Sequence, residues 1–285
     1  MNYQTPTSAA DAARLLSKEG AQVLAGGTDL LVRLRAGMAT PATIVDIKGV
    51  PRLRGIEHDA QGWRIGAATP CAEIGEHAAL AAAWPGVVEA LQLIGSTQIQ
   101  GRATLGGNLC NASPAADTVP ALIAAGAICE VIGLKGQREV PVEEIITGPG
   151  KNALARGEFV LGFRLPNPPQ RSGDAYLRLI PRTEMDIAVV GAGVSLALDA
   201  KGVCTQARVS LGAVAPTPLL VAEAAKALIG TKVDDVALEK LAAAASAACK
   251  PIDDKRGTVA YRVKVAGVLA KRAARIAHER ANTKK

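Results

Sequence analysis

Two glycine pairs mark the places in this 285-residue sequence where backbone amides could bind an anion. The first lies in residues 25–29, AGGTD, between a short apolar stretch and an amphipathic one. Glycines expose backbone N–H groups, and such a nest before a helix N-terminus suits a phosphate. Thr28 adds a hydroxyl donor. The segment therefore predicts either a phosphate or pyrophosphate site or an ordinary strand-to-helix turn, and the turn is the simpler interpretation for one glycine pair alone.

The second pair lies in residues 104–108, TLGGN, inside a polar, glycine-rich stretch from 95 to 114 that lacks helical periodicity. We expect a long surface loop there, which is unusual without a ligand. Asn111, Ser113 and Asp117 follow, and amide or carboxylate groups can recognise hydroxyls and ring N–H groups. Two phosphate-nest candidates in one domain favour a dinucleotide.

Other chemistries lack their sequence signatures. No GxGxxG, GxxxxGK or GxSxG pattern is present, which disfavours a Rossmann NAD site, a P-loop and a hydrolase elbow. The five cysteines form no CxxC pair, and the three histidines are isolated. We therefore predict no catalytic and no metal-ligating residue. Arg178 and Arg182, with Asp186 nearby, form either an internal salt bridge or a cationic face toward an electron-rich cofactor.

The elements that must position these residues suggest two α+β domains, with a break at the proline-rich stretch 166–169. Ser8 is placed to cap a first helix, and residues 23–47 predict a strand–loop–helix–strand unit with parallel pairing. Strands are then expected at 63–66, 127–132, 138–140 and 159–165, with helices at 86–94 and 118–125. Beyond the break we expect strands at 175–180, 187–198 and 204–211, and helices at 219–228, 235–249 and 259–280.

Composition narrows the class of protein further. Hydrophobic residues make up 49% of the chain, enough for a real core. The net charge of +7 resides in residues 262–285, which form either a solvated basic helix face or a docking surface for an acidic partner. Only 2% of residues are aromatic, which argues against binding of single-stranded nucleic acid by base stacking. We expect no nucleic-acid partner. No apolar run approaches the length of a membrane span and no signal peptide is evident, so we expect a cytoplasmic protein.

Four segments in this order resemble the FAD-binding medium subunit of molybdenum hydroxylases, the family of carbon monoxide dehydrogenase and xanthine dehydrogenase. They are AGGTD at 25–29, TLGGN at 104–108, ASPAAD at 112–117, and Arg182 followed by MDIA at 185–188. The resemblance covers essentially the whole chain. It implies an α+β protein with a two-subdomain FAD-binding fold of the vanillyl-alcohol-oxidase (PCMH) type in residues 1–170. The subdomains would span about 1–53 and 54–170, and residues 171–285 would form a domain with a three-stranded antiparallel sheet and helices.

The resemblance also implies a set of cofactor-binding residues. Backbone groups of 25–29 and 104–108 would hold the pyrophosphate, and Asp117 would lie near the ribityl or adenosine hydroxyls. Val160 or Leu161 would approach the flavin or adenine, and Arg178 replaces a lysine that several relatives have near the flavin ring. The full predicted set is Leu24, Ala25, Gly26, Gly27, Thr28, Asp29, Leu30, Ile94, Thr104, Gly106, Gly107, Asn108, Asn111, Ser113, Asp117, Val160, Leu161 and Arg178.

The function implied is electron transfer within a larger enzyme. A large subunit would carry the molybdenum cofactor and a small subunit two 2Fe–2S clusters, assembled with this chain as a dimer of heterotrimers. Electrons would pass through the clusters to FAD in this chain and on to an external acceptor. The alternative is a stand-alone FAD-dependent oxidoreductase or flavin-binding module of the same fold. The lack of a cysteine-rich insertion implies that this chain holds no additional iron–sulfur cluster.

Overall fold

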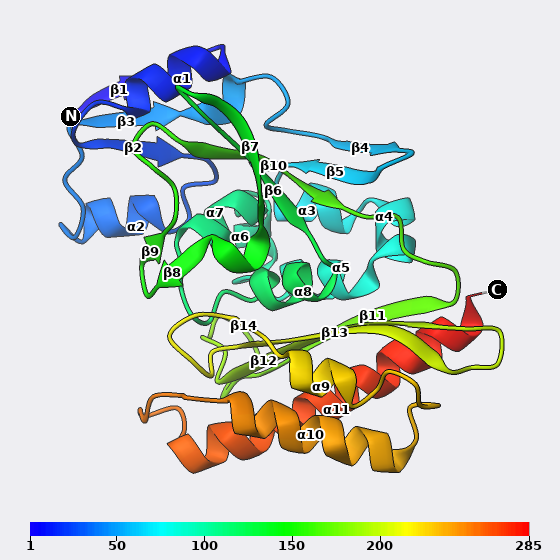
Figure 1. The fold of residues 1–285 in the computed structure, drawn as a ribbon. Helices are drawn as coiled ribbons and strands as arrows, with labels where there is room; N and C mark the ends of the chain where they lie inside the picture. The colour runs from blue at the N-terminus through cyan, green and yellow to red at the C-terminus, as the bar shows by residue number, and fades with distance from the viewer. Residues whose placement is uncertain (285) are drawn as a thin grey trace.

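The computed structural model describes residues 1–284 and begins with a small parallel sheet (Figure 1). Its order is β1 (Asn2–Gln4), β3 (Thr43–Asp46) and β2 (Ala21–Leu24). Ser8 caps α1 (Ala9–Leu16) as predicted, because its Oγ accepts the Asp11 N–H at 3.1 Å. The helix α2 (Leu30–Arg35) connects β2 to β3, which confirms the parallel strand–helix–strand unit. The strand β1 was not expected.

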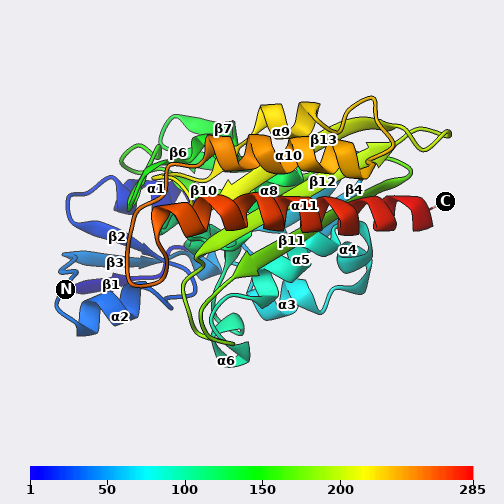
Figure 2. The same ribbon diagram turned by 90° about the horizontal axis from the view of Figure 1, so that it is seen from below.

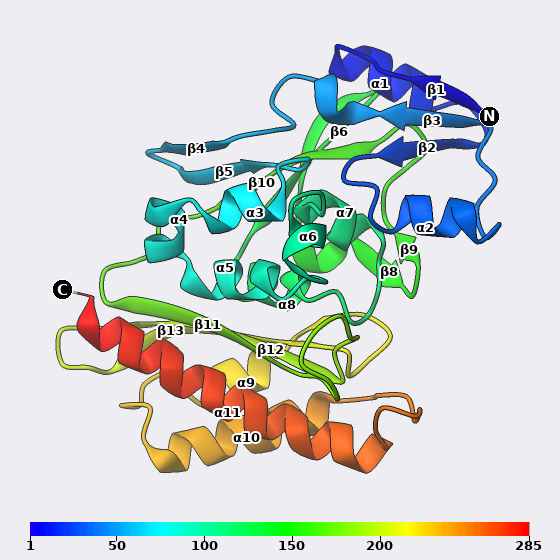
Figure 3. The same cartoon turned by 180° about the vertical axis from the view of Figure 1, so that it is seen from behind.

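A five-stranded antiparallel sheet follows, in the order β4 (Ile56–Asp59), β5 (Gly62–Gly66), β10 (Phe159–Leu165), β6 (Ile128–Gly133) and β7 (Gly136–Pro141). Most of the helices between β5 and β6 lie between this sheet and the C-terminal part of the chain (Figures 1 and 3). They are α3 (Cys71–Gly75), α4 (Ala78–Ala83), α5 (Pro85–Gln92), α6 (Thr97–Gln100), α7 (Leu105–Cys110) and α8 (Thr118–Ala124). The short elements η1 (Ile47–Gly49), η2 (Val142–Glu144), β8 (Ile146–Gly148) and β9 (Lys151–Asn152) complete this half.

The expected long loop at 95–114 is wrong, because the two short helices α6 and α7 occupy it. Thr104 caps α7 with its Oγ1, which accepts the Gly107 N–H at 3.0 Å. Leu105 and Leu109 are fully buried on the inner face of this helix. Two consecutive glycines lower helix propensity, so a six-residue helix held by its cap and by burial leaves little periodic signal in the sequence.

The C-terminal sheet consists of β11 (Ser172–Leu179), β12 (Val190–Leu198) and β13 (Cys204–Gly212), which pair antiparallel as the resemblance implied. A fourth strand, β14 (Leu219–Leu220), pairs with β13. The helix expected from residue 219 is therefore displaced, and α9 spans Ala222–Lys226. The long helices α10 (Asp235–Ala248) and α11 (Val259–Thr283) lie side by side on the outer face of the sheet (Figure 2).

The apolar side chains form two buried clusters, one drawn from residues 12–176 and the other from residues 175–281. They meet across β11, where Ala175 belongs to one cluster and Tyr176 to the other. The helix α8 packs on β12 so closely that a Cβ on Gly193 would lie 2.6 Å from the Pro120 carbonyl oxygen. Within residues 1–284 no helix is both long and apolar enough to cross a membrane.

Candidate functional site

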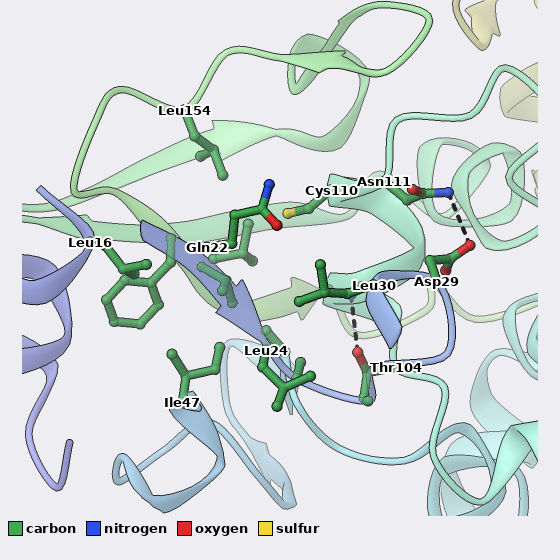
Figure 4. A pocket seen from close by; sticks show the side chains of 18 of the residues that line it. Leu16, Gln22, Leu24, Asp29, Leu30, Ile47, Thr104, Cys110, Asn111 and Leu154 are labelled. Carbon is green, nitrogen blue, oxygen red and sulfur yellow. Dashed lines mark hydrogen bonds between the residues drawn. The ribbon is translucent and has the colours of Figure 1, made fainter. Parts of the chain in front are cut away.

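A cavity of about 550 Å³ opens where the two glycine segments meet the chain between β9 and β10 (Figure 4). The end of β2, residues 25–29 and the start of α2 form one wall of this cavity. Most of the predicted site residues line this cavity: Leu24, Ala25, Gly26, Gly27, Thr28, Asp29, Leu30, Ile94, Thr104, Gly106, Gly107, Asn108, Asn111 and Val160. The structure therefore brings together two segments that lie about 80 residues apart in the sequence.

Glycine is required in each segment because other backbone lies directly against it. A Cβ on Gly26 would lie 1.9 Å from the Arg102 carbonyl oxygen, and a Cβ on Gly106 would lie 2.7 Å from the Ala67 carbonyl oxygen. Gly27 has a φ of +81°, a conformation that glycine adopts without strain. The glycine pairs therefore serve close backbone packing as well as exposure of amides.

The backbone N–H groups of Gly26, Gly27, Thr28 and Asp29 have no acceptor within the described chain. In contrast, the Gly106 N–H donates to the Ala67 carbonyl at 3.1 Å, and the Gly107 N–H donates to Thr104. The free donors thus come from residues 26–29, just before the N-terminus of α2. An anion with several oxygens fits this nest.

The charges around the nest also favour an anion. Lys18, Arg33 and Arg156 line the cavity, and none of them forms an ion pair among residues 1–284. Glu158 is already paired with Arg138, at 2.8 Å. Asp29 lies at the same rim, where desolvation raises the pKa of its carboxyl group and the charge of Arg33 opposes that rise. Of these three cations, Arg33 is the one whose charge acts on Asp29 at the nest, while Lys18 and Arg156 belong to the part of the wall where Gly157 packs against Ser17.

The other end of the cavity is mainly apolar and was not singled out in the sequence. Leu16, Ile47, Leu154 and Phe159 line it, together with Gln22 on β2. These five residues come from five separate elements or connections, so no local pattern marks them as a group. The one signal available was the polar Gln22 two residues before the buried Leu24, on the same side of the strand.

The remaining predicted residues do not line the cavity. Ser113 Oγ accepts the Ala115 N–H at 3.2 Å, and Leu161 occupies a bulge in β10 with its side chain in the core. Asp117 accepts hydrogen bonds from Tyr176 at 3.0 Å and from Arg178 at 2.7 Å. Their contact with a cofactor stays a prediction.

Asp117 is nevertheless an unusual carboxyl group. Burial raises its pKa to about 6, although the charge of Arg178 and the hydroxyl of Tyr176 both lower it. The Nε atom of Arg178 is buried without a partner. The ion pair between Asp117 and Arg178 thus joins the N-terminus of α8 to β11. Arg178 forms an internal salt bridge, as one of the two interpretations predicted, but its partner is Asp117 and not Asp186. Arg182 bonds Asp186 at 3.1 Å on the surface.

Comparisons with protein families account for nearly the whole chain. Residues 1–168 match the model described as "FAD binding domain in molybdopterin dehydrogenase", and residues 175–277 match "CO dehydrogenase flavoprotein C-terminal domain". The chain belongs to the FAD-binding medium subunits of the molybdenum hydroxylases. It is therefore an oxidoreductase subunit with FAD as its cofactor.

Individual relatives agree with this membership. The carbon monoxide dehydrogenase medium chain of Afipia carboxidovorans is 38% identical over 282 residues, covering 98% of this chain and 97% of the relative. The xanthine dehydrogenase FAD-binding subunit of Escherichia coli O157:H7 is 34% identical over 221 residues, covering 76% of this chain and 75% of the relative. A chain of reconstituted CO dehydrogenase from Oligotropha carboxidovorans superposes with a TM-score of 0.94 at 37% identity, covering 98% of each chain.

The residues present fit FAD. Four free amides at residues 26–29, with the positive charge of Arg33 near Asp29, suit a pyrophosphate, and residues 26–29 line the cavity. The apolar end suits a flat ring system. The cavity wall carries no aromatic side chain except Phe159, so aliphatic side chains and backbone form most of the surface available for ring packing.

Proposed function

We propose that this medium subunit passes electrons from the 2Fe–2S clusters of a small partner subunit to an external acceptor. When bound, FAD supplies the redox chemistry. The observation that carries the proposal is the nest of free amides at residues 26–29, set in a cavity of about 550 Å³ between two structurally fixed glycine segments.

The chain's own residues bind and orient the cofactor. In this proposal the amides of Gly26, Gly27, Thr28 and Asp29 donate to the pyrophosphate, and the nearby positive charge of Arg33 favours the anion. The 104–108 segment contributes by close backbone contact, because the amides of its glycine pair are already bonded. No residue needs to act as an acid, base or nucleophile, since a cofactor subunit supplies placement and electrostatics.

The proposal includes the assembly that the resemblance implies. A large subunit would hold the molybdenum cofactor and a small subunit two 2Fe–2S clusters, together with this chain as a dimer of heterotrimers. Within the chain, an FAD-binding domain would span 1–170, with subdomains of about 1–53 and 54–170, and a second domain 171–285. The match boundaries at 168 and 175 support that division. The cytoplasmic location expected from the sequence remains part of the proposal.

The test compares the isolated chain with the chain produced together with its large and small partners. Both preparations should show the absorbance of bound flavin. Reduction of the flavin by the substrate of the complex should require the partners. If a small organic substrate bleaches the flavin of the isolated chain, the subunit proposal fails and the stand-alone oxidoreductase is correct.

A further inference from the structure

One side chain in the cavity has a hydrogen-bonding group that the protein leaves unused. The Oε1 atom of Gln22 is buried and has no hydrogen-bond partner among the described residues. Gln22 lies on the edge strand β2, and its side chain projects beside Cys110 with Leu16 and Leu154 on the other side in Figure 4. A buried acceptor without a partner is costly, so its place in a cavity wall points to a ligand donor.

The surroundings of Gln22 are apolar and offer no second free amide. Leu16, Ile47 and Phe159 line this end of the cavity. Asn152 also lines the cavity, but both ends of its amide are already bonded: its Nδ2 donates to the Cys110 carbonyl at 3.1 Å and its Oδ1 accepts the Leu154 N–H at 3.2 Å. The end therefore presents one carboxamide in an apolar slot.

A single free carboxamide among apolar side chains indicates which of the two ring systems of FAD lies at this end of the cavity. The pyrophosphate separates adenosine from the riboflavin part, so a nest at 26–29 assigns one ring system to each side. Isoalloxazine carries polar groups along a whole edge and must meet redox partners. Adenine needs a flat apolar slot and one donor–acceptor pair, which a glutamine carboxamide matches at the 6-amino group and a neighbouring ring nitrogen.

Resting on the proposed function, we propose that Gln22 is the adenine-recognition residue of this subunit. Its Oε1 accepts a hydrogen from the adenine 6-amino group and its Nε2 donates to a ring nitrogen. The slot of Leu16, Ile47, Leu154 and Phe159 packs on the base. Gln22 thereby gives the site its preference for an adenine dinucleotide.

The experiment uses the full apo chain, Gln22→Met as a near-isosteric variant, and Gln206→Met as the control. Gln206 is exposed on β13 and its side chain makes no hydrogen bond among residues 1–284. The probes are FAD and flavin purine dinucleotide, an FAD analogue that lacks only the 6-amino group of adenine. Affinities are measured by quenching of flavin fluorescence, and apo stability by thermal unfolding.

Gln22→Met should weaken FAD binding about 5- to 100-fold, the effect of losing one bidentate amide–base contact. Wild type should lose affinity for the purine analogue, and Gln22→Met should bind both dinucleotides equally. The apo variant should melt no lower than wild type, because an apolar side chain replaces an unsatisfied oxygen. Gln206→Met should behave as wild type.

Equal FAD affinity in wild type and Gln22→Met overturns the inference and leaves the proposed function standing. The inference is also overturned if removing the 6-amino group from the dinucleotide weakens binding by the same factor in Gln22→Met as in wild type. The Gln22 carboxamide and the 6-amino group would then not interact. If the wild-type chain, alone and with its partners, binds no FAD, the proposed function fails and this inference fails with it.

Discussion

Alanine at Gly26 should disturb the cofactor nest more than any other single methyl group near the cavity. Its Cβ would lie 1.9 Å from the Arg102 carbonyl oxygen and 2.8 Å from the carbonyl carbon, both backbone atoms that cannot rotate away. Contacts below about 3.0 Å do not occur for real Cβ atoms, so the 25–29 segment must move by about 1 Å or more. Overpacking of this kind costs about 1–3 kcal/mol of folding stability.

The loss of FAD affinity follows from the same displacement. Hydrogen bonds from amides to a charged oxygen contribute about 1.5–3 kcal/mol each and weaken steeply when donor and acceptor separate by 1 Å or more. Losing one such bond weakens binding about 10- to 150-fold. We therefore expect Gly26→Ala to lower the melting temperature by several degrees, about 2–4 °C per kcal/mol for a chain of this size class, and to weaken FAD binding by at least about tenfold.

The assay is thermal unfolding of the apo chain combined with titration of FAD by fluorescence quenching. Gly101→Ala is the matched control one residue before Arg102. Gly101 has a φ of −63°, and a Cβ there would lie 3.7 Å from its nearest neighbour, the Gln98 carbonyl oxygen. That variant should match wild type in both measurements. A Gly26→Ala variant that melts lower but binds FAD as tightly as wild type would refute the assignment of the nest to the cofactor.

Three further changes test the framework around the site. Burial raises the pKa of Asp174 to about 7, so the folded chain holds this proton more tightly than the unfolded chain. Ionisation of Asp174 in the unfolded chain therefore lowers the free energy of unfolding as pH rises from about 4 to about 7. Asp174→Asn should make the free energy of urea unfolding less dependent on pH in this range. An unchanged dependence on pH would contradict this. Arg64→Met should destabilise by about 1–3 kcal/mol, because Glu130, only 2% exposed, loses its 2.8 Å partner but keeps Arg164 at 3.3 Å and Arg52 at 3.5 Å. Adding Glu130→Leu should recover most of that loss in denaturant unfolding, because a buried charge is then removed as well. Gly193→Ala places a Cβ 2.6 Å from the Pro120 carbonyl oxygen and should lower the free energy of unfolding by about 1–3 kcal/mol. FAD affinity should stay within twofold of wild type. A parallel loss of affinity would contradict this and show that the contact and the cavity are coupled.

Local chemistry made much of the fold predictable. The Ser8 cap, the parallel unit around residues 23–47 and the antiparallel C-terminal strands all carry their signal within a few neighbouring residues. The sequence does not predict α7, because its six residues, LGGNLC, show no helical periodicity of apolar side chains. Its stability depends on a Thr104 cap and on burial of Leu105 and Leu109 by residues distant in the sequence. Burial by remote elements is not encoded in a short window of sequence.

The same distinction applies within the site. The nest was predictable because strand, glycine pair and helix N-terminus are adjacent in the chain, yet the reason that Gly26 must be glycine is its contact with Arg102. The amides of the second glycine pair already form intramolecular hydrogen bonds, and the expectation that residues 104–108 help to hold the pyrophosphate stays a prediction.

Gln22 shows what sequence reasoning cannot supply. In the sequence it is one polar residue in a short strand. In the structure its significance is a buried oxygen without a partner in the wall of a cavity that Leu16, Ile47 and Leu154, from other parts of the chain, also line. An unsatisfied group is defined by everything that surrounds it, so only the assembled cavity can reveal it. The residues that specify the cofactor's base are therefore harder to find from sequence than those that bind its phosphates, because phosphate binding uses local backbone amides and base recognition uses side chains from separate elements.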